Sequence, residues 1–109
     1  MAQFEATTSI EPDRVVVALA GECDLSVRTD MSSVLHDAVT KSSLVAVDLR
    51  ELTFLDSSGI HELVAAHQAA RAGGGRVYVR NASGVVAEVL DVTGVAQLLR
   101  PPNEDAVDG

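Results

Sequence analysis

The sequence predicts an α/β protein: a single domain with a mixed, mostly parallel sheet of about four to five strands and helices packed on that sheet. Short β-branched runs alternate along the chain with segments whose apolar residues recur at helical spacing. This alternation is typical of parallel strands joined by right-handed crossovers. A chain of 109 residues with 47% hydrophobic residues is long and apolar enough to form one core.

Apolar, β-branched segments predict strands at residues 7–10, 14–20, 44–48 and 76–79, and a last short one at Leu98-Leu99. The first of them runs into Glu11-Pro12-Asp13, which is typical of an edge strand and a turn, because proline cannot donate a ladder hydrogen bond. The second is a continuous apolar run, typical of a strand that is buried on both faces, and Gly21 is expected to end it.

Apolar residues at helical spacing predict helices from Ser26 to about Thr40, from the Ser57 region to Ala72, and around residues 86–90. Asp24 or Ser26 can cap the first helix, and a run of three glycines stops the second. Because Pro101-Pro102 and acidic residues follow, we expect a domain over residues 1–100 and a flexible acidic tail over 101–109.

Charge and composition exclude several classes of function. The net charge of −8 disfavours direct binding of nucleic acid or of an anionic membrane surface. The single cysteine, Cys23, cannot form an internal disulfide, which fits a reducing cytoplasm. No segment has the spacing of metal ligands, a phosphate-binding loop or a catalytic acid–base pair. We therefore expect no cofactor, no metal and no enzymatic activity.

The most informative segment is Phe54-Leu55-Asp56-Ser57-Ser58-Gly59-Ile60, between an apolar strand and a periodic helix. Asp56 is a candidate N-cap, which puts Ser57 and Ser58 in the first helical turn. A helix N-terminus favours negative charge by about 0.3–1 kcal/mol, so a phosphate on Ser57 could be tolerated there. From spacing alone, a simple cap and turn remains the alternative. A catalytic triad of Ser57, His61 and Asp56 is disfavoured, because adjacent residues cannot orient one another.

The chain resembles a STAS domain, and more narrowly the bacterial anti-sigma factor antagonists, also called anti-anti-sigma factors. The residues that carry this resemblance are Gly21-Glu22-Cys23-Asp24, Val47-Asp48-Leu49, the segment 54–60, the glycine run, Val77-Tyr78-Val79 and Val92-Thr93-Gly94-Val95. The resemblance covers roughly residues 15–100, which is nearly the whole chain.

The resemblance implies a partner switch. The unphosphorylated antagonist would bind an anti-sigma factor, which is a serine kinase of the GHKL ATPase type, and so release a sigma factor. The kinase would use ATP and Mg²⁺ to phosphorylate Ser57, and a metal-dependent serine phosphatase would reverse the reaction. The implied partner-binding residues are Asp24, Asp56, Ser57, Ser58, Gly59 and His61, with Asp24 close to Ser57. The family expectation is a cytoplasmic monomer or weak dimer.

Two other kinds of function are open at this point. One is a constitutive STAS scaffold or a subunit of a larger regulatory or transport complex, such as a stressosome or a lipid-transport ATPase. The other is a small-molecule or nucleotide-binding domain, which would need a pocket with convergent polar groups.

A structural interpretation is favoured for His36, His67 and Cys23, whereas two interpretations are open for His61. His61 departs from the family pattern and is either a solvated surface residue or a hydrogen-bond donor to a phosphate on Ser57, one helical turn before it. His67 is expected to be partly buried and His36 exposed. Cys23 is expected to be a packing residue, since no neighbouring feature supports a redox role.

Overall fold

The computed structural model describes residues 3–102. All but the first two residues of the tail predicted for 101–109 therefore lie outside the described residues. The elements in chain order are β1 (Glu5–Ile10), β2 (Val15–Cys23), a 3₁₀ helix (Leu25–Val27), α1 (Arg28–Lys41), β3 (Leu44–Leu55), α2 (Ser57–Ala72), β4 (Arg76–Arg80), α3 (Gly84–Val92) and α4 (Val95–Leu98).

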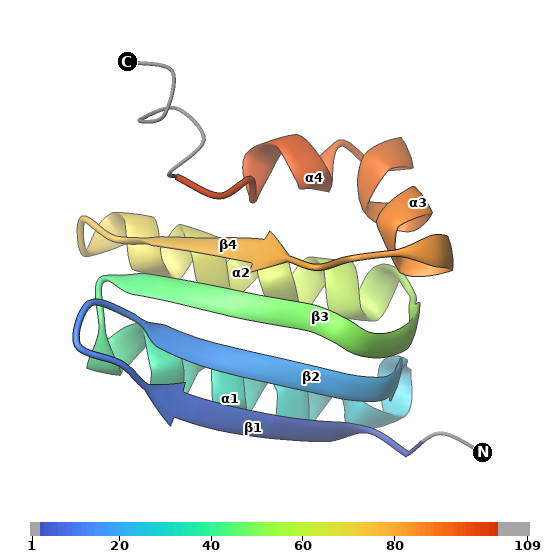
Figure 1. Cartoon of the computed structure of the whole chain (residues 1–109), viewed down its shortest axis with the longest axis horizontal. Coiled ribbons are helices and arrows are strands. Elements are labelled where there is room, and N and C mark those ends of the chain that lie inside the picture. Colours follow the sequence, from blue (N-terminus) through green and yellow to red (C-terminus); the bar gives the residue numbers. More distant parts are fainter. Residues whose placement is uncertain (1–2, 103–109) are drawn as a thin grey trace.

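The sheet has four strands in the order β1-β2-β3-β4. β1 is antiparallel to β2, whereas β2, β3 and β4 are mutually parallel, which confirms the predicted mixed, mostly parallel sheet. Helices α1 and α2 cover one face, and α3 and α4 lie along the outer edge of β4 (Figure 1). Because β2 and β3 are parallel, their carboxyl ends lie side by side at one end of the sheet, where Cys23 pairs with Leu55.

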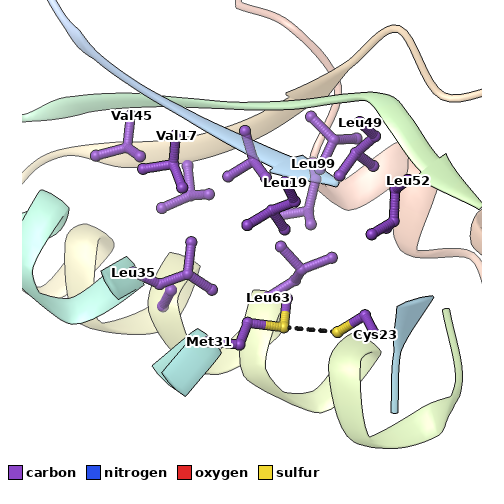
Figure 2. Packing of buried hydrophobic residues seen from close by; sticks show 14 of the residues in the cluster. Val17, Leu19, Cys23, Met31, Leu35, Val45, Leu49, Leu52, Leu63 and Leu99 are labelled. Carbon is purple, nitrogen blue, oxygen red and sulfur yellow. Dashed lines mark hydrogen bonds between the residues drawn. The ribbon is translucent and has the colours of Figure 1, made fainter. Parts of the chain in front are cut away.

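The main core lies between the sheet and the two long helices and is aliphatic (Figure 2). Val17 and Leu19 point down from β2, and Met31, Leu35 and Leu63 meet them from α1 and α2. A smaller cluster on the opposite face of the sheet contains Val16, Ala46 and Tyr78. The middle of the sheet is thus packed on both faces, which accounts for the continuous apolar runs of its strands.

The second strand does not end at Gly21 as predicted but continues to Cys23. Gly21 has φ +89°, and the pairing of β2 with β3 shifts register on either side of it. A Cβ at this position would lie 2.2 Å from the carbonyl oxygen of Gln3. The glycine therefore forms a bulge within the strand instead of stopping it. The prediction of burial on both faces holds for residues 15–17 but fails at Ala18, which is exposed.

The short strand predicted at Leu98-Leu99 is wrong. Leu98 ends helix α4, and the N–H of Leu99 donates to the carbonyl of Val95 over 2.9 Å. Gly94, with φ +80°, separates α3 from α4. The carbonyl of Leu99 nevertheless accepts a hydrogen bond from the Val79 N–H over 2.9 Å. The Leu99 segment therefore supplies the partner for one backbone N–H of β4.

Candidate functional site

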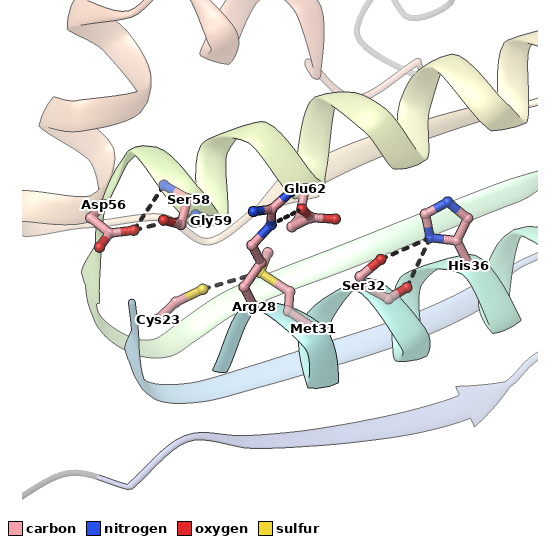
Figure 3. Close-up of polar contacts among 9 residues, drawn as sticks. All are labelled: Cys23, Arg28, Met31, Ser32, His36, Asp56, Ser58, Gly59 and Glu62. Atoms are coloured by element: carbon pink, nitrogen blue, oxygen red, sulfur yellow. Dashed lines mark hydrogen bonds and ion pairs between the residues drawn. The ribbon is translucent and has the colours of Figure 1, made fainter. Parts of the chain in front are cut away.

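Helix α2 begins at Ser57 because Asp56 caps it. The Asp56 backbone is extended (φ −106°), and its Oδ1 accepts hydrogen bonds from the N–H groups of Ser58 at 2.9 Å and Gly59 at 3.3 Å (Figure 3). These are two of the N–H groups that lack partners within a helix. The predicted N-cap is therefore confirmed, and Ser57 is the first residue of a 16-residue helix.

The predicted site residues differ in exposure. Ser57 is exposed, Ser58 is partly buried, and Gly59 is buried. A Cβ on Gly59 would lie 2.4 Å from Leu55 Cδ1 and 2.7 Å from Cys23 Sγ. Gly59 therefore lies in the packing beneath the turn, where it lets the helix approach the ends of two strands.

The strand register puts Asp24 beside Asp56. Each aspartate directly follows one residue of the Cys23–Leu55 pair, and the Asp56 N–H donates to the Cys23 carbonyl over 3.2 Å. Oδ1 of Asp24 accepts from the Ser26 backbone N–H at 3.0 Å and from its hydroxyl at 2.6 Å. Two turns, each fixed by its own aspartate, thus meet at one edge of the sheet. This register is consistent with the expected proximity of Asp24 and Ser57.

Cys23 lies underneath these turns. It is fully buried, and its Sγ lies 3.0 Å from Sδ of Met31 (Figures 2 and 3). Burial, followed by the negative charges of Asp56 and Asp24, raises the pKa of the thiol to about 12. The thiol is neutral at physiological pH, and the predicted packing role of Cys23 is confirmed.

Sequence reasoning missed an ion pair that joins α1 to α2 beside the site. Nε of Arg28 lies 2.8 Å from Oε2 of Glu62, a carboxylate that is almost fully buried (Figure 3). The Arg28 hydrogen bond, together with one from Ser32, holds the pKa of Glu62 below its usual value against the effect of burial. The local sequence gives at most half of this pair: Glu62 adjoins Leu63 and would need a cation if buried, but the partner lies on another helix.

His61 is exposed one helical turn after Ser57. It contributes to a groove of about 420 Å³ between α1 and α2, whose other lining residues are Arg28, Thr29, Ser32, Ser33 and Glu62. His61 thus lies beside the Arg28–Glu62 ion pair.

The other two histidines have polar contacts within the fold. His67 is buried, and its Nδ1 accepts a hydrogen bond from the Val77 N–H over 3.1 Å. Burial and the nearby charges of Arg76 and Arg71 lower the pKa of His67. His36 is exposed, as predicted, with Nδ1 at 2.9 Å from the Ser32 carbonyl oxygen.

A larger groove, of about 1060 Å³, lies between β4, α3 and α4. Its lining residues include Arg80, Asn81, Glu88 and Asp91, but none of the residues predicted for the site. Within residues 3–102, no three His, Cys, Asp or Glu side chains are grouped so that they could hold a metal ion. No helix in the same range is long and apolar enough to cross a membrane.

Comparison with known proteins places this geometry in a family. The structure is similar to the unphosphorylated anti-sigma factor antagonist SpoIIAA (TM-score 0.75, 23% identity, 97% of this chain and 94% of that chain covered). It is also similar to the phosphorylated Bacillus cell fate determinant SpoIIAA (TM-score 0.68, 22% identity, 97% of each chain). A third similar structure is an anti-sigma factor antagonist from Mycobacterium paratuberculosis (TM-score 0.78, 20% identity, 97% of this chain and 92% of that one).

At these identities the solved structures show a shared fold. A sequence model of a family, described as "Mlab, STAS domain", matches residues 6–101. This match extends over nearly all of the described structure, from β1 to the end of α4. The chain therefore belongs to the STAS domain family.

Proposed function

We propose that this chain is an anti-sigma factor antagonist that acts by partner switching, as a cytoplasmic monomer or weak dimer. Unphosphorylated, it binds an anti-sigma factor that is a serine kinase of the GHKL ATPase type, and a sigma factor is released. Phosphorylation of Ser57 ends this binding, and a metal-dependent serine phosphatase restores it. The observation that carries the proposal is the exposed Ser57 at the start of a capped helix, next to Asp56 and Asp24.

The chemistry of the switch belongs to the kinase. The Oγ of Ser57 forms a bond to the γ-phosphorus of ATP while the bond from that phosphorus to the bridging oxygen of ADP breaks. The hydroxyl proton passes to a base on the kinase or to solvent. The antagonist contributes an accessible hydroxyl on the turn that Asp56 caps. As a substrate of the kinase, it does not have to activate this hydroxyl itself.

Electrostatics explain how one phosphate could release the partner. A phosphoserine carries about −1.5 to −2 charges at pH 7. At Ser57 this charge would be added to those of Asp24 and Asp56, and like charges in an interface cost several kcal/mol. Each 1.4 kcal/mol weakens binding about tenfold, so local charge suffices. That similar folds are known for an unphosphorylated and a phosphorylated antagonist supports this proposal.

The proposal is tested by capture from extract of the source cell on Ser57→Ala and Ser57→Glu baits, followed by mass spectrometry. We expect an ATPase-type serine kinase on the alanine bait and much less of it on the glutamate bait. Ser43→Glu, which adds the same charge at an exposed position before β3, is the matched control and should retain the kinase. Equal capture by both Ser57 baits would favour the alternative, a constitutive scaffold or a subunit of a larger regulatory or transport complex.

A second measurement tests the modified residue itself. The captured kinase is incubated with the wild-type chain and ATP, and the product is digested and sequenced by mass spectrometry. We expect phosphate on Ser57 and no phosphate in the Ser57→Ala variant. Phosphate on Ser58 alone would contradict the assignment.

A further inference from the structure

Two arginines at one end of the molecule have no acidic partner within residues 3–102. Four other basic side chains in that range form ion pairs, whereas Arg71 and Arg76 form none there. Arg71 is in the last turn of α2 and Arg76 is the first residue of β4, so only a short glycine turn separates them (Figure 1). Arg71 and Arg76 are named the cationic corner.

The cationic corner also contains an unsatisfied donor. Nε of Arg76 is buried and has no hydrogen-bond partner in the described structure. A buried donor without an acceptor and two like charges close together are both unfavourable. Burial, and then the positive charges of Arg76 and Arg71, lower the pKa of His67, which lies beside the corner. His67 therefore senses both cations, and it can report a negative charge that is brought to them.

The chain itself continues from a point next to the cationic corner. Nη2 of Arg76 donates to the carbonyl oxygen of Arg100 over 3.0 Å, and the described chain ends two residues later. The residues that follow are Asn103, Glu104, Asp105, Ala106, Val107, Asp108 and Gly109. Three of them are acidic and none is basic. An extended chain advances about 3.3–3.6 Å per residue, so the first of these acids is within reach of both arginines.

We propose that residues 103–109, the acidic segment, dock on the cationic corner through the carboxylates of Glu104, Asp105 and Asp108. Charge and covalent attachment select this occupant. The net charge of −8 would repel a free acidic partner, whereas the acidic segment is tethered beside the corner and is present there at high local concentration. The contact lies at the opposite end of α2 from Ser57, so it does not rest on the proposed partner switch.

The first test is zero-length cross-linking of the full chain with a carbodiimide, which joins a carboxylate to an amine only when the two are in contact. Arg71→Lys places an amine in the cationic corner and keeps the charge. We expect an amide link between the introduced lysine and an acid of the acidic segment, identified by digestion and mass spectrometry. Arg50→Lys is the matched control, because Arg50 is also exposed and forms no ion pair within residues 3–102. This variant should give no link to the acidic segment.

The ion pair between Lys41 and Asp37, with 2.8 Å between Nζ and Oδ2, shows whether the reagent works. Its link should form in every variant. If it forms and the acidic segment is not linked in Arg71→Lys, or is linked equally well in Arg50→Lys, the inference is overturned. A link that occurs only in cross-linked dimers and disappears on dilution also overturns it, because the acidic segment would then dock on a second copy of the chain.

The second test follows the imidazole of His67 by NMR during a pH titration. Glu104→Gln, Asp105→Asn and Asp108→Asn together should lower the pKa of His67, because Arg71 and Arg76 would then act on it without compensation. This difference from the wild type should vanish in 1 M salt, where the Debye length is about 3 Å. An equal pKa of His67 in both proteins at low salt would contradict the docked position.

Discussion

Removing the Arg28 guanidinium is expected to destabilise the fold through the carboxylate of Glu62. The Glu62 side chain is only 6% exposed, whereas that of Arg28 is 51% exposed. An exposed ion pair contributes about 0–1 kcal/mol, whereas breaking a fully buried pair costs about 3–5 kcal/mol. Because one partner is buried and the other is half in solvent, we expect Arg28→Ala to lower the free energy of unfolding by about 1–3 kcal/mol at pH 7.

The loss of unfolding free energy in Arg28→Ala should depend on pH and should be smaller in acid. The pKa of Glu62 is lowered in the folded protein, first of all by the Arg28 hydrogen bond. A carboxyl group with a lowered folded-state pKa stabilises the fold above its unfolded-state pKa, which is about 4.3 for glutamate. This contribution is lost as the pH falls from that value through the lowered pKa of Glu62. The difference in stability between wild type and Arg28→Ala should therefore shrink in that acidic window.

The assay is a double-mutant cycle with urea unfolding followed by circular dichroism. It compares the wild type, Arg28→Ala, Glu62→Gln and the double variant at pH 7 and at several acidic values. The coupling free energy should be about 1 kcal/mol or more at pH 7 and should approach zero in acid. The matched control is the exposed pair Lys41–Asp37, with 2.8 Å between Nζ and Oδ2. Its coupling should stay below about 0.5 kcal/mol. An Arg28–Glu62 coupling no larger than this, or one unchanged by acid, would refute the reasoning.

Three further predictions concern the packing around the site and the sheet. Gly59→Ala should lower the free energy of unfolding by about 1–3 kcal/mol in a urea titration, because its Cβ would lie 2.4 Å from Leu55 Cδ1; an unchanged midpoint would contradict the packing. The Cys23 thiol, with a pKa of about 12, should resist iodoacetamide at pH 8 in the native protein and react on unfolding; fast native labelling would show that it is accessible. The pKa of His67 is lowered, so neutral His67 stabilises the fold above its unfolded-state pKa of about 6.5, and this part of the stability is lost as the pH falls through the lowered value. The melting temperature should thus fall between pH 7.5 and 5 in the wild type and less so in His67→Gln.

Local signals predicted well what local interactions determine. The cap at Asp56 depends on hydrogen bonds that reach two and three residues along the chain, and the sequence shows all the atoms involved. The parallel strands follow from the same short-range alternation of strand and helix. The two wrong predictions, a strand end at Gly21 and a strand at Leu98-Leu99, rested on local patterns that fit more than one structure. A glycine in a strand can end it or form a bulge, and two leucines fit a strand or a helical turn equally well.

The parts of the site that the sequence did not reveal depend on contacts between distant residues. The Arg28–Glu62 pair spans 34 positions and exists because α1 and α2 pack side by side on the sheet. The exposure of Phe54 likewise depends on the register of β2 with β3, since nothing in the local pattern shows that Phe54 is exposed while Leu55 is buried. A one-residue shift in strand pairing would exchange these two side chains.

The cap at Asp56 also determines how a phosphate on Ser57 would act. An uncapped helix N-terminus would offer its free N–H groups to the phosphate, which could then fold back onto its own helix. In this chain Oδ1 of Asp56 already accepts from the Ser58 and Gly59 N–H groups. The phosphate would therefore lack these donors and would repel the carboxylate that occupies them, which directs it outward toward a bound partner. On this argument Asp56→Ala should weaken the effect of phosphorylation on kinase binding, because the phosphate could then take over the vacant cap. If the fold-loss on phosphorylation is the same in Asp56→Ala as in the wild type, the cap has no part in the switch.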